Sequence, residues 1–446
     1  MISYLIVICL IIVSLMSIKK YKLLGFILLV ALIGSDTDSA GILYAIEAYF
    51  PAYKIVVRGI TLLLFIHSII YIINMYFKGK IKKNLFWIYF VPLILLSIIV
   101  FIVNVVRGVD LITALSEIIW LGIPIFFIWS VGIIKNEDSH SVFTKIIMYQ
   151  AVVTAIVLLM GPLTAEINGV SYAYLIGDDN WKSLSQTVLN AKISIGQFTK
   201  YSLSTLKFAQ FHNPNTLGLY STTYLALSLH LLIFNRSKRK IGQSIFLFII
   251  GFIGWFNSLT RGPIFLTLIV LSFYLFGILI KPKKYSRVFI LLIFGMILVL
   301  NTGTVLNVLQ YFLVDSINIS FTSRLSGYNF AFEAIASNPL GGVMPTLSDP
   351  IPHILPLKIG AYYGIPALIL ISIPFLHMLI IGSKNFLLDI LNGRSEETVF
   401  YMILLGIIYG AILTNGIIAY VLFWVLVAEI LKKFGMFERN LVCSKV

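Results

Sequence analysis

The stretch TSRLSGYNFAFEAIASNPLGGVMPTLSDPIPHILPLKIGAYYGIP (322–366) differs from almost everything around it in this chain. Long apolar runs precede and follow it, whereas this stretch carries polar residues, prolines and paired glycines. It also holds Arg324 and His353, in a chain where charged and titratable side chains are rare. We therefore expect the apolar runs to build a scaffold and this stretch to carry the chemistry.

The first half of this stretch predicts a short helix. Apolar residues recur at spacings of three and four between 325 and 335, which puts them on one helix face. Thr322 or Ser323 can cap its start, and NPLGG (338–342) ends it. Arg324 then lies in the first turn, where free N–H groups already carry positive partial charge, at a cost of about 0.3–1 kcal/mol. A bound anion reverses that cost, which favours a phosphate-binding arginine over a solvated surface arginine.

The composition of the whole chain indicates a membrane protein. Its 446 residues are 59% hydrophobic and only 11% charged, with a mean hydropathy of +0.99. Many windows hold about 20 apolar residues, enough to cross the hydrocarbon core of a bilayer. We expect an all-α, polytopic membrane protein with about 12–13 transmembrane helices and a periplasmic helical loop, forming one integral membrane domain over 1–446. The spans are expected near 2–18, 23–35, 57–77, 85–106, 112–134, 143–161, 215–234, 241–258, 263–280, 288–312, 357–382, 398–413 and 417–431.

The net charge of +15 reflects membrane topology. In a soluble protein such a charge would suggest a nucleic-acid partner, but here most of the 33 basic residues collect in alternate loops, such as 78–83 and 236–240. Because basic loops stay in the cytoplasm, we expect the N-terminus outside, the C-terminus inside and an odd number of spans. The outer segments are then 36–56, the long polar loop 162–214, and the loop 314–356 with the candidate active site. No nucleic-acid partner is expected.

Arg261 is a second candidate arginine. It lies in SLTRGP (258–263), a tight turn between two predicted spans. The basic clusters at 236–240 and 281–287 place the loops on either side of this hairpin in the cytoplasm, so the turn itself lies outside. An arginine at such a position is either an interface anchor or a functional residue that faces a cavity.

Two polar motifs precede Arg261 in segments that are expected on the outer side of the membrane. Two carboxylates two residues apart at 36–38 (Asp-Thr-Asp) could hold a divalent cation, but the pattern is short and common, so a polar helix end is the favoured interpretation. The loop 162–214 leads into FHNPNTLGLY (211–220), where Pro214 and Asn215 predict a turn and a helix start. His212 is a catalytic candidate, although an interfacial histidine is more often only a hydrogen-bonding residue.

His353 is the candidate base. It lies between Pro352 and Pro356, which hold the chain in a non-helical approach to the next span. A histidine of ordinary pKa, near 6.5, is mostly neutral at neutral pH and can accept a proton. The alternative is a membrane-interface histidine without chemistry. No Cys/His metal-ligand spacing occurs, so we expect neither a metal nor another cofactor.

The motifs FHNPNTLGLY, SLTRGP, SRLSGYNFAFEAIASNPLGGV and PHILPLKIGAYYGIPALIL, in this order, resemble the O-antigen polymerase and O-antigen ligase superfamily. These Wzy-type proteins are metal-independent glycosyltransferases of the GT-C type, and the resemblance covers roughly the second half of the chain. Arg261, Arg324 and His353 match the arginine of a T/S-R-G turn, the arginine that opens a periplasmic helix before N-P-x-G, and the following histidine. This chain departs from the pattern at Ile354, where an asparagine is common, and at Tyr328, where a tryptophan is common.

The resemblance implies a substrate and a mechanism. The substrate is an undecaprenyl-diphosphate-linked oligosaccharide at the outer face of a bacterial cytoplasmic membrane. Arg261 and Arg324 hold the diphosphate leaving group, and His353 deprotonates the attacking sugar hydroxyl, so that one displacement inverts the anomeric centre. Membrane lipid and a chain-length regulator protein are the other expected partners. Further substrate contacts are expected from Tyr328, Asn215 and His212.

Three other functions remain open. A ligase would use the same site but pass the glycan to a lipid A-core acceptor; the polymerase is favoured because the loop 162–214 offers surface for a repeat unit. A metal-dependent GT-C enzyme would rely on the carboxylate pair at 36–38. A transporter of lipid-linked glycans would place ionisable groups deep in its spans, whereas Arg58, Glu117 and Glu429 fall near predicted span ends.

Overall fold

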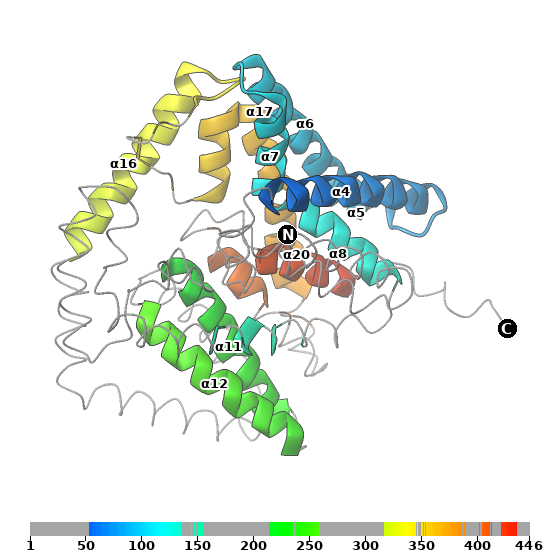
Figure 1. The fold of residues 1–446 in the computed structure, drawn as a ribbon, viewed down its shortest axis with the longest axis vertical. Helices are drawn as coiled ribbons and strands as arrows, with labels where there is room; N and C mark the ends of the chain where they lie inside the picture. The colour runs from blue at the N-terminus through cyan, green and yellow to red at the C-terminus, as the bar shows by residue number, and fades with distance from the viewer. Residues whose placement is uncertain are drawn as a thin grey trace, which may run out of the picture.

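The described part of the protein is helical throughout (Figure 1). The computed structural model describes residues 53–135, parts of 144–155, 214–234, 238–258, most of 316–388, parts of 401–412 and 421–434. Within these residues every regular element is a helix, which confirms the predicted all-α class. The helices are α4 (Tyr53–Phe77), α5 (Lys83–Leu85), η1 (Phe86–Phe90), α6 (Val91–Val106), α7 (Leu111–Trp120), α8 (Ile123–Lys135), α11 (Pro214–Phe234), α12 (Lys238–Ser258), α16 (Ser316–Ser337), α17 (Leu355–His377), η5 (Met378–Gly382) and α20 (Val421–Lys433).

Two of the described helices are long and apolar enough to cross a membrane. They are the continuous helix Lys83–Val106, which joins α5, η1 and α6, and the helix Leu355–Asn385, which contains α17 and η5. Both coincide with predicted spans. The segments predicted near 57–77, 215–234 and 241–258 are also helical, as α4, α11 and α12. The total of 12–13 crossings stays a prediction.

The span predicted over 112–134 is helical but bent. It consists of α7 and α8, which meet at a bend of 53°. Gly122 causes the break, because it adopts a left-handed conformation (φ 66°) that ends α7. Asp110 caps the start of α7, and hydrogen bonds from the Thr113 side chain and from the amides of Thr113 and Ile112 hold the pKa of this carboxyl below its usual range. If the bent pair counts as one span, the described residues contain three.

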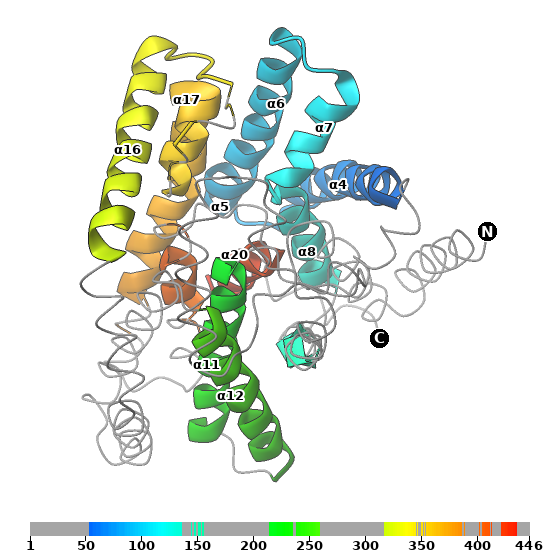
Figure 2. The same cartoon turned by 60° about the vertical axis from the view of Figure 1, so that its left-hand side comes forward.

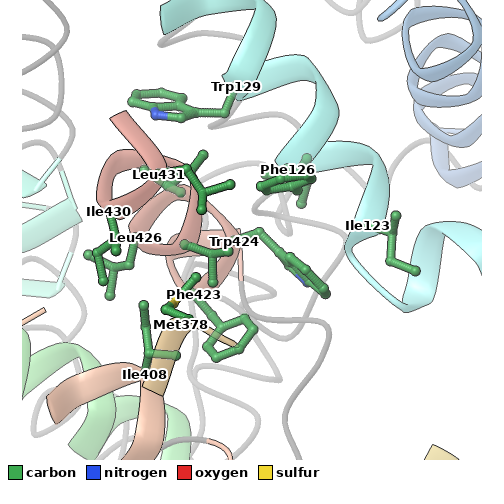
Figure 3. Close-up of a cluster of buried hydrophobic side chains, with 14 of the residues drawn as sticks. Ile123, Phe126, Trp129, Met378, Ile408, Phe423, Trp424, Leu426, Ile430 and Leu431 are labelled. Atoms are coloured by element: carbon green, nitrogen blue, oxygen red, sulfur yellow. The ribbon is translucent and has the colours of Figure 1, made fainter. Parts of the chain in front are cut away.

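A buried aromatic core joins α8, α20 and the end of α17 (Figure 3). The rings of Phe126 and Trp424 lie 6.1 Å apart, and both side chains are fully buried. The indole N–H of Trp424 donates to the carbonyl of Leu121 at 2.9 Å, and that of Trp129 donates to Oε1 of Glu429 at 3.1 Å. Both buried indoles therefore have an acceptor, as their burial requires.

Helices α11 and α12 pack against each other as a hairpin (Figure 2). The helix start predicted after the turn at 213–215 is confirmed, because α11 begins at Pro214, whose missing N–H costs nothing at this position. Some of its buried hydroxyls have partners within the hairpin: Thr222 donates to the carbonyl of Gly218, and the side chains of Ser228 and Ser244 contact each other at 3.1 Å.

Helix α16 begins earlier than predicted. It starts at Ser316, so the predicted cap at 322–323 is wrong, and Arg324 lies more than two turns inside the helix. The apolar stripe continues upstream through Ile317 and Phe321 at helical spacing, which explains the longer helix. The free N–H groups of the helix start are thus not at Arg324, and the argument from the helix dipole does not apply to it.

Helix α16 packs on α17 through small residues (Figure 2). Ala331 and Ala334 are buried against Ala361 of α17. Leu325 and Phe332, which belong to the predicted apolar face, are 47% and 60% exposed. The alanines therefore make the close part of the contact, because small side chains allow two helices to approach closely. Ile335, from the predicted face, also lies beside Gly360 of α17.

Candidate functional site

The turn NPLGG (338–342) ends α16 as the sequence predicts. The Asn338 side chain organises it: its Oδ1 accepts from the amide of Gly341 at 3.2 Å, and its Nδ2 donates to the carbonyl of Gly342 at 2.8 Å. The amide of Gly342 donates to the Asn338 carbonyl at 2.8 Å, and Gly342 has a φ of 64° that favours glycine. These hydrogen bonds all lie within 338–342, so the turn holds its shape without a contribution from α17.

Helix α17 is interrupted where this turn docks. Gly364 has φ 85° and ψ 179°, a conformation essentially restricted to glycine. Pro366 has no N–H, so the carbonyl of Tyr362 has no helical partner four residues later. The amide of Ile365 also turns away from its helical acceptor, Ala361. The sequence YYGIP (362–366) thus leaves two carbonyls that need donors from elsewhere.

Backbone groups at the turn form hydrogen bonds with two backbone groups that the break in α17 leaves without helical partners. The amide of Val343 donates to the carbonyl of Ala361 at 2.8 Å, and the amide of Ile365 donates to the carbonyl of Pro339 at 2.7 Å. These two backbone hydrogen bonds run in opposite directions between the turn and α17. The turn is therefore joined to the break by the same kind of paired backbone exchange that joins two β-strands.

Two glycines permit this close approach. A Cβ at Gly342 would lie 2.5 Å from the carbonyl oxygen of Ala361, and a Cβ at Gly364 would lie 2.6 Å from the carbonyl carbon of Leu340. Real Cβ atoms essentially never come so near to backbone atoms. At this contact the backbone of the turn therefore touches the backbone of α17. Neither Gly342 nor Gly364 can carry a side chain without overlapping the opposite segment.

Arg107 completes the junction from a third segment. It caps the end of α6, and its Nη2 donates to the carbonyls of Gly341 at 2.6 Å and Tyr362 at 2.7 Å. Its guanidinium carbon lies 6.0 Å from the centre of the Tyr363 ring. Partial burial lowers the pKa of this guanidinium from its usual value, but an arginine stays protonated in proteins. The guanidinium of Arg107 therefore donates hydrogen bonds to both the turn and the broken helix.

A polar cluster lies behind this junction, between α6, α7 and α17. The Tyr363 hydroxyl donates to Oε2 of Glu117 at 3.4 Å, which is long for a hydrogen bond of this type. Asn104, also buried, lies beside Tyr363, and its Nδ2 has no hydrogen-bond partner among the described atoms. Arg58 donates to the Ser116 hydroxyl at 3.5 Å. The cluster thus places donors, acceptors and a carboxylate at the same end of the bundle as the docked turn.

The structure describes part of the site predicted from the sequence. Arg324 and Tyr328 are one turn apart in α16, and Tyr328 is half-buried. Asn215 is the second residue of α11. Pro352 is buried and Ile354 immediately precedes α17, so both neighbours of the predicted base are described. The remaining candidates lie outside the described residues: His353, Arg261, His212, Asp36 and Asp38.

Sequence reasoning missed Arg107. In the sequence it is one more basic residue after a predicted span, followed by Gly108. A signal did exist elsewhere: a glycine followed two residues later by a proline, inside the span predicted over 357–382, implies unpaired carbonyls that need an external donor. The identity of that donor could not be read from the sequence, because Arg107 and Tyr362 are 255 residues apart.

Comparisons with known proteins assign neither a family nor a function to this chain. No protein-family model matches the chain, and no curated protein matches it. The function must therefore be argued from the motifs and from the geometry that surrounds them.

Proposed function

We propose that this protein is a polysaccharide polymerase of the bacterial cytoplasmic membrane. It joins undecaprenyl-diphosphate-linked repeat units at the outer face by inverting glycosyl transfer. The observation that carries the proposal is the ordered set of motifs around Arg261, Arg324 and His353. The docked turn 338–342 supports it, because backbone hydrogen bonds fix the end of the helix that bears Arg324 on α17.

The chemistry needs cations and a base. The oxygen of the acceptor hydroxyl attacks the anomeric carbon of the donor, and the bond from that carbon to the diphosphate oxygen breaks. His353 takes the hydroxyl proton, and the diphosphate leaves with its added negative charge held by Arg261 and Arg324. Since Arg324 lies inside α16, its contribution rests on the guanidinium fork alone.

The expected orientation places this site outside the cell. The helices Lys83–Val106 and Leu355–Asn385 are apolar enough to cross the membrane, and the basic loop 78–83 precedes the first of them. A cysteine at Met344, which is 61% exposed, should react with a membrane-impermeant thiol reagent added to intact cells. A cysteine at Ser237, in a basic loop, should not. The reverse result would overturn the orientation.

The direct test uses purified protein and a synthetic lipid-linked repeat unit. A polymerase should produce a ladder of glycans from this substrate alone, whereas a ligase should require a lipid A-core acceptor. His353→Ala should reduce the rate about 10²- to 10⁴-fold, the usual contribution of a general base. His67→Ala is the matched control, because His67 is an exposed residue on α4. A folded His353→Ala protein that still makes long chains would remove His353 from the mechanism.

Transport of lipid-linked glycans is the second candidate. One observation favours it: Glu429 is only 2% exposed and lies among the aromatic residues of the α8–α20 core, although its sequence position suggested a span end. Ionisable residues inside membrane bundles are often part of a transport path. Proteoliposomes that move a labelled lipid-linked repeat unit across the bilayer without elongating it would favour the transporter over the polymerase.

A further inference from the structure

We propose that the turn between α4 and the helix Lys83–Val106 is a binding surface for anionic phospholipids. This turn carries lysines and lies between exposed aromatic residues, at the end of a helix that is apolar enough to cross a membrane. The ligand is the phosphate group of a membrane lipid whose acyl chains lie beside the same turn. No residue of the glycosyl-transfer site takes part, so this lipid surface is independent of the proposed function.

Four lysines lie within 78–83, and no described residue neutralises them. Lys78, Lys82 and Lys83 are exposed, and Lys80 is half-buried. None of their ammonium groups forms an ion pair or a hydrogen bond with another described residue, and the sequence holds no acidic residue between 53 and 109. A lysine near an anionic lipid surface strengthens binding about fivefold, so four of them attract such lipids strongly.

The backbone of this turn has a fixed shape. Helix α4 ends in a Schellman motif, in which the amide of Lys80 donates to the carbonyl of Met75 at 2.9 Å. The amide of Gly79 donates to the carbonyl of Tyr76 at the same distance, and Gly79 has the left-handed φ, 68°, that the motif requires. Ile81 is only 2% exposed and anchors the turn in the apolar core. A turn held in this way requires little ordering when a ligand binds.

Aromatic residues on both sides of the turn add an apolar part to the surface. Phe77 is 80% exposed before it, and Trp87 is 58% exposed after it. The Trp87 indole donates to the Tyr76 hydroxyl at 3.2 Å, and the Tyr76 ring stacks on Phe86 with 4.1 Å between the ring centres. Tryptophan and tyrosine favour the boundary between hydrocarbon and headgroups. A soluble anion would contact only the lysines, whereas a phospholipid contacts the lysines through its phosphate and the rings through its chains.

The turn lies at the depth of the headgroup phosphates. The helix that begins at Lys83 has 24 residues and is therefore about 36 Å long. It covers a hydrocarbon core of about 30 Å and leaves its first residues among the headgroups. Its other end adjoins Arg107, which bonds to the docked turn 338–342. The lysines therefore lie in the leaflet opposite the docked turn, at the edge of the described helices (Figure 1).

The first experiment uses Trp87 as a local reporter. The full-length protein is reconstituted in phosphatidylcholine bilayers that contain increasing fractions of phosphatidylglycerol with brominated acyl chains, which quench indole fluorescence on contact. Subtracting the signal of a Trp87→Phe variant isolates Trp87 from the other tryptophans of the chain, which has six in all. Half-quenching should occur at a lower fraction of brominated phosphatidylglycerol than of brominated phosphatidylcholine. Equal quenching by the two lipids would overturn the proposal.

Charge variants test the lysines themselves. Lys82→Gln and Lys83→Gln should each raise the fraction of brominated phosphatidylglycerol at half-quenching about fivefold, whereas Lys83→Arg should leave it unchanged. Lys384→Gln is the matched control, because Lys384 is exposed near the end of the antiparallel helix Leu355–Asn385, in the same leaflet but outside the turn. Wild-type quenching in both glutamine variants, or an equal loss in Lys384→Gln, would contradict a specific lipid surface.

Inorganic phosphate distinguishes a lipid from a soluble anion. Replacing chloride by phosphate at constant ionic strength should not change quenching of Trp87 by brominated phosphatidylglycerol, because free phosphate has no apolar part to contact the aromatic rings. Displacement of the lipid by millimolar phosphate would assign the turn to a soluble anion and overturn the proposal. None of these measurements uses glycosyl transfer, so they remain decisive even if the protein does not elongate the repeat unit.

Discussion

Replacing Gly342 by alanine tests whether the turn docks as described, because it adds one methyl group at the closest contact. That methyl would lie 2.5 Å from the carbonyl oxygen of Ala361 and 2.5 Å from the carbonyl carbon of Tyr362. Both atoms belong to the backbone and cannot rotate away as a side chain could. The variant can relieve the overlap only if the whole turn moves away from α17, which breaks the bonds of Val343 and Ile365.

The expected cost has two parts. The left-handed conformation, φ 64°, costs a residue with a Cβ about 1–2 kcal/mol. The overlap adds about 1–3 kcal/mol, the usual cost of inserting a methyl group into a packed site. Gly79→Ala separates the two parts, because Gly79 has a similar φ of 68° and nothing within 4 Å of its Cβ position. Gly342→Ala should therefore lose about 1–3 kcal/mol more than Gly79→Ala.

The assay is reversible unfolding of the purified protein in mixed detergent micelles, with the free energy of unfolding measured for the wild type and both variants. Hydrogen exchange should localise the effect of Gly342→Ala to 338–345 and 360–366. Equal losses of stability in the two variants, with no change in exchange at these peptides, would mean that the turn is not docked on α17. The reasoning about Gly364, which makes the reciprocal contact, would fail with it.

Three further predictions concern the mechanism and the core. Arg324→Lys should lower kcat about 10²- to 10³-fold, the range for loss of one charge-stabilising donor, since an ammonium lacks the fork; near-normal turnover of the lipid-linked substrate would remove it from the diphosphate site. Asp36→Ala and Asp38→Ala should stay active and resist EDTA; activity lost to EDTA and restored by a divalent cation would favour the metal-dependent enzyme. Glu429→Leu should cost about 1–3 kcal/mol of stability by leaving the Trp129 indole without its acceptor, whereas Glu429→Gln should preserve both stability and polymerisation; loss of function in a stable Glu429→Gln protein would favour the transporter.

Local sequence signals predicted the local structure well. The helices over Lys83–Val106 and Leu355–Asn385 follow from continuous apolar runs, and NPLGG ends α16 because proline and glycine cannot continue a helix there. The start of α16 was predicted wrongly, because Thr322 can either cap a helix or lie within one. The choice depended on whether the apolar stripe extends upstream, which it does through Ile317 and Phe321.

The sequence by itself determined the helical class that the described residues show and the helix-breaking residues at 338–342. It also holds Pro366, which deprives the carbonyl of Tyr362 of its helical donor, although the span over 357–382 was predicted without a break. Only the tertiary structure decided that these two segments satisfy each other, that Gly342 and Gly364 face the opposite backbone, and that Arg107 supplies the remaining donor. The physical reason is distance along the chain. A missing N–H or a left-handed glycine is a property of a few neighbouring residues, whereas the partner of an unpaired carbonyl is chosen by packing between segments that are up to 255 residues apart.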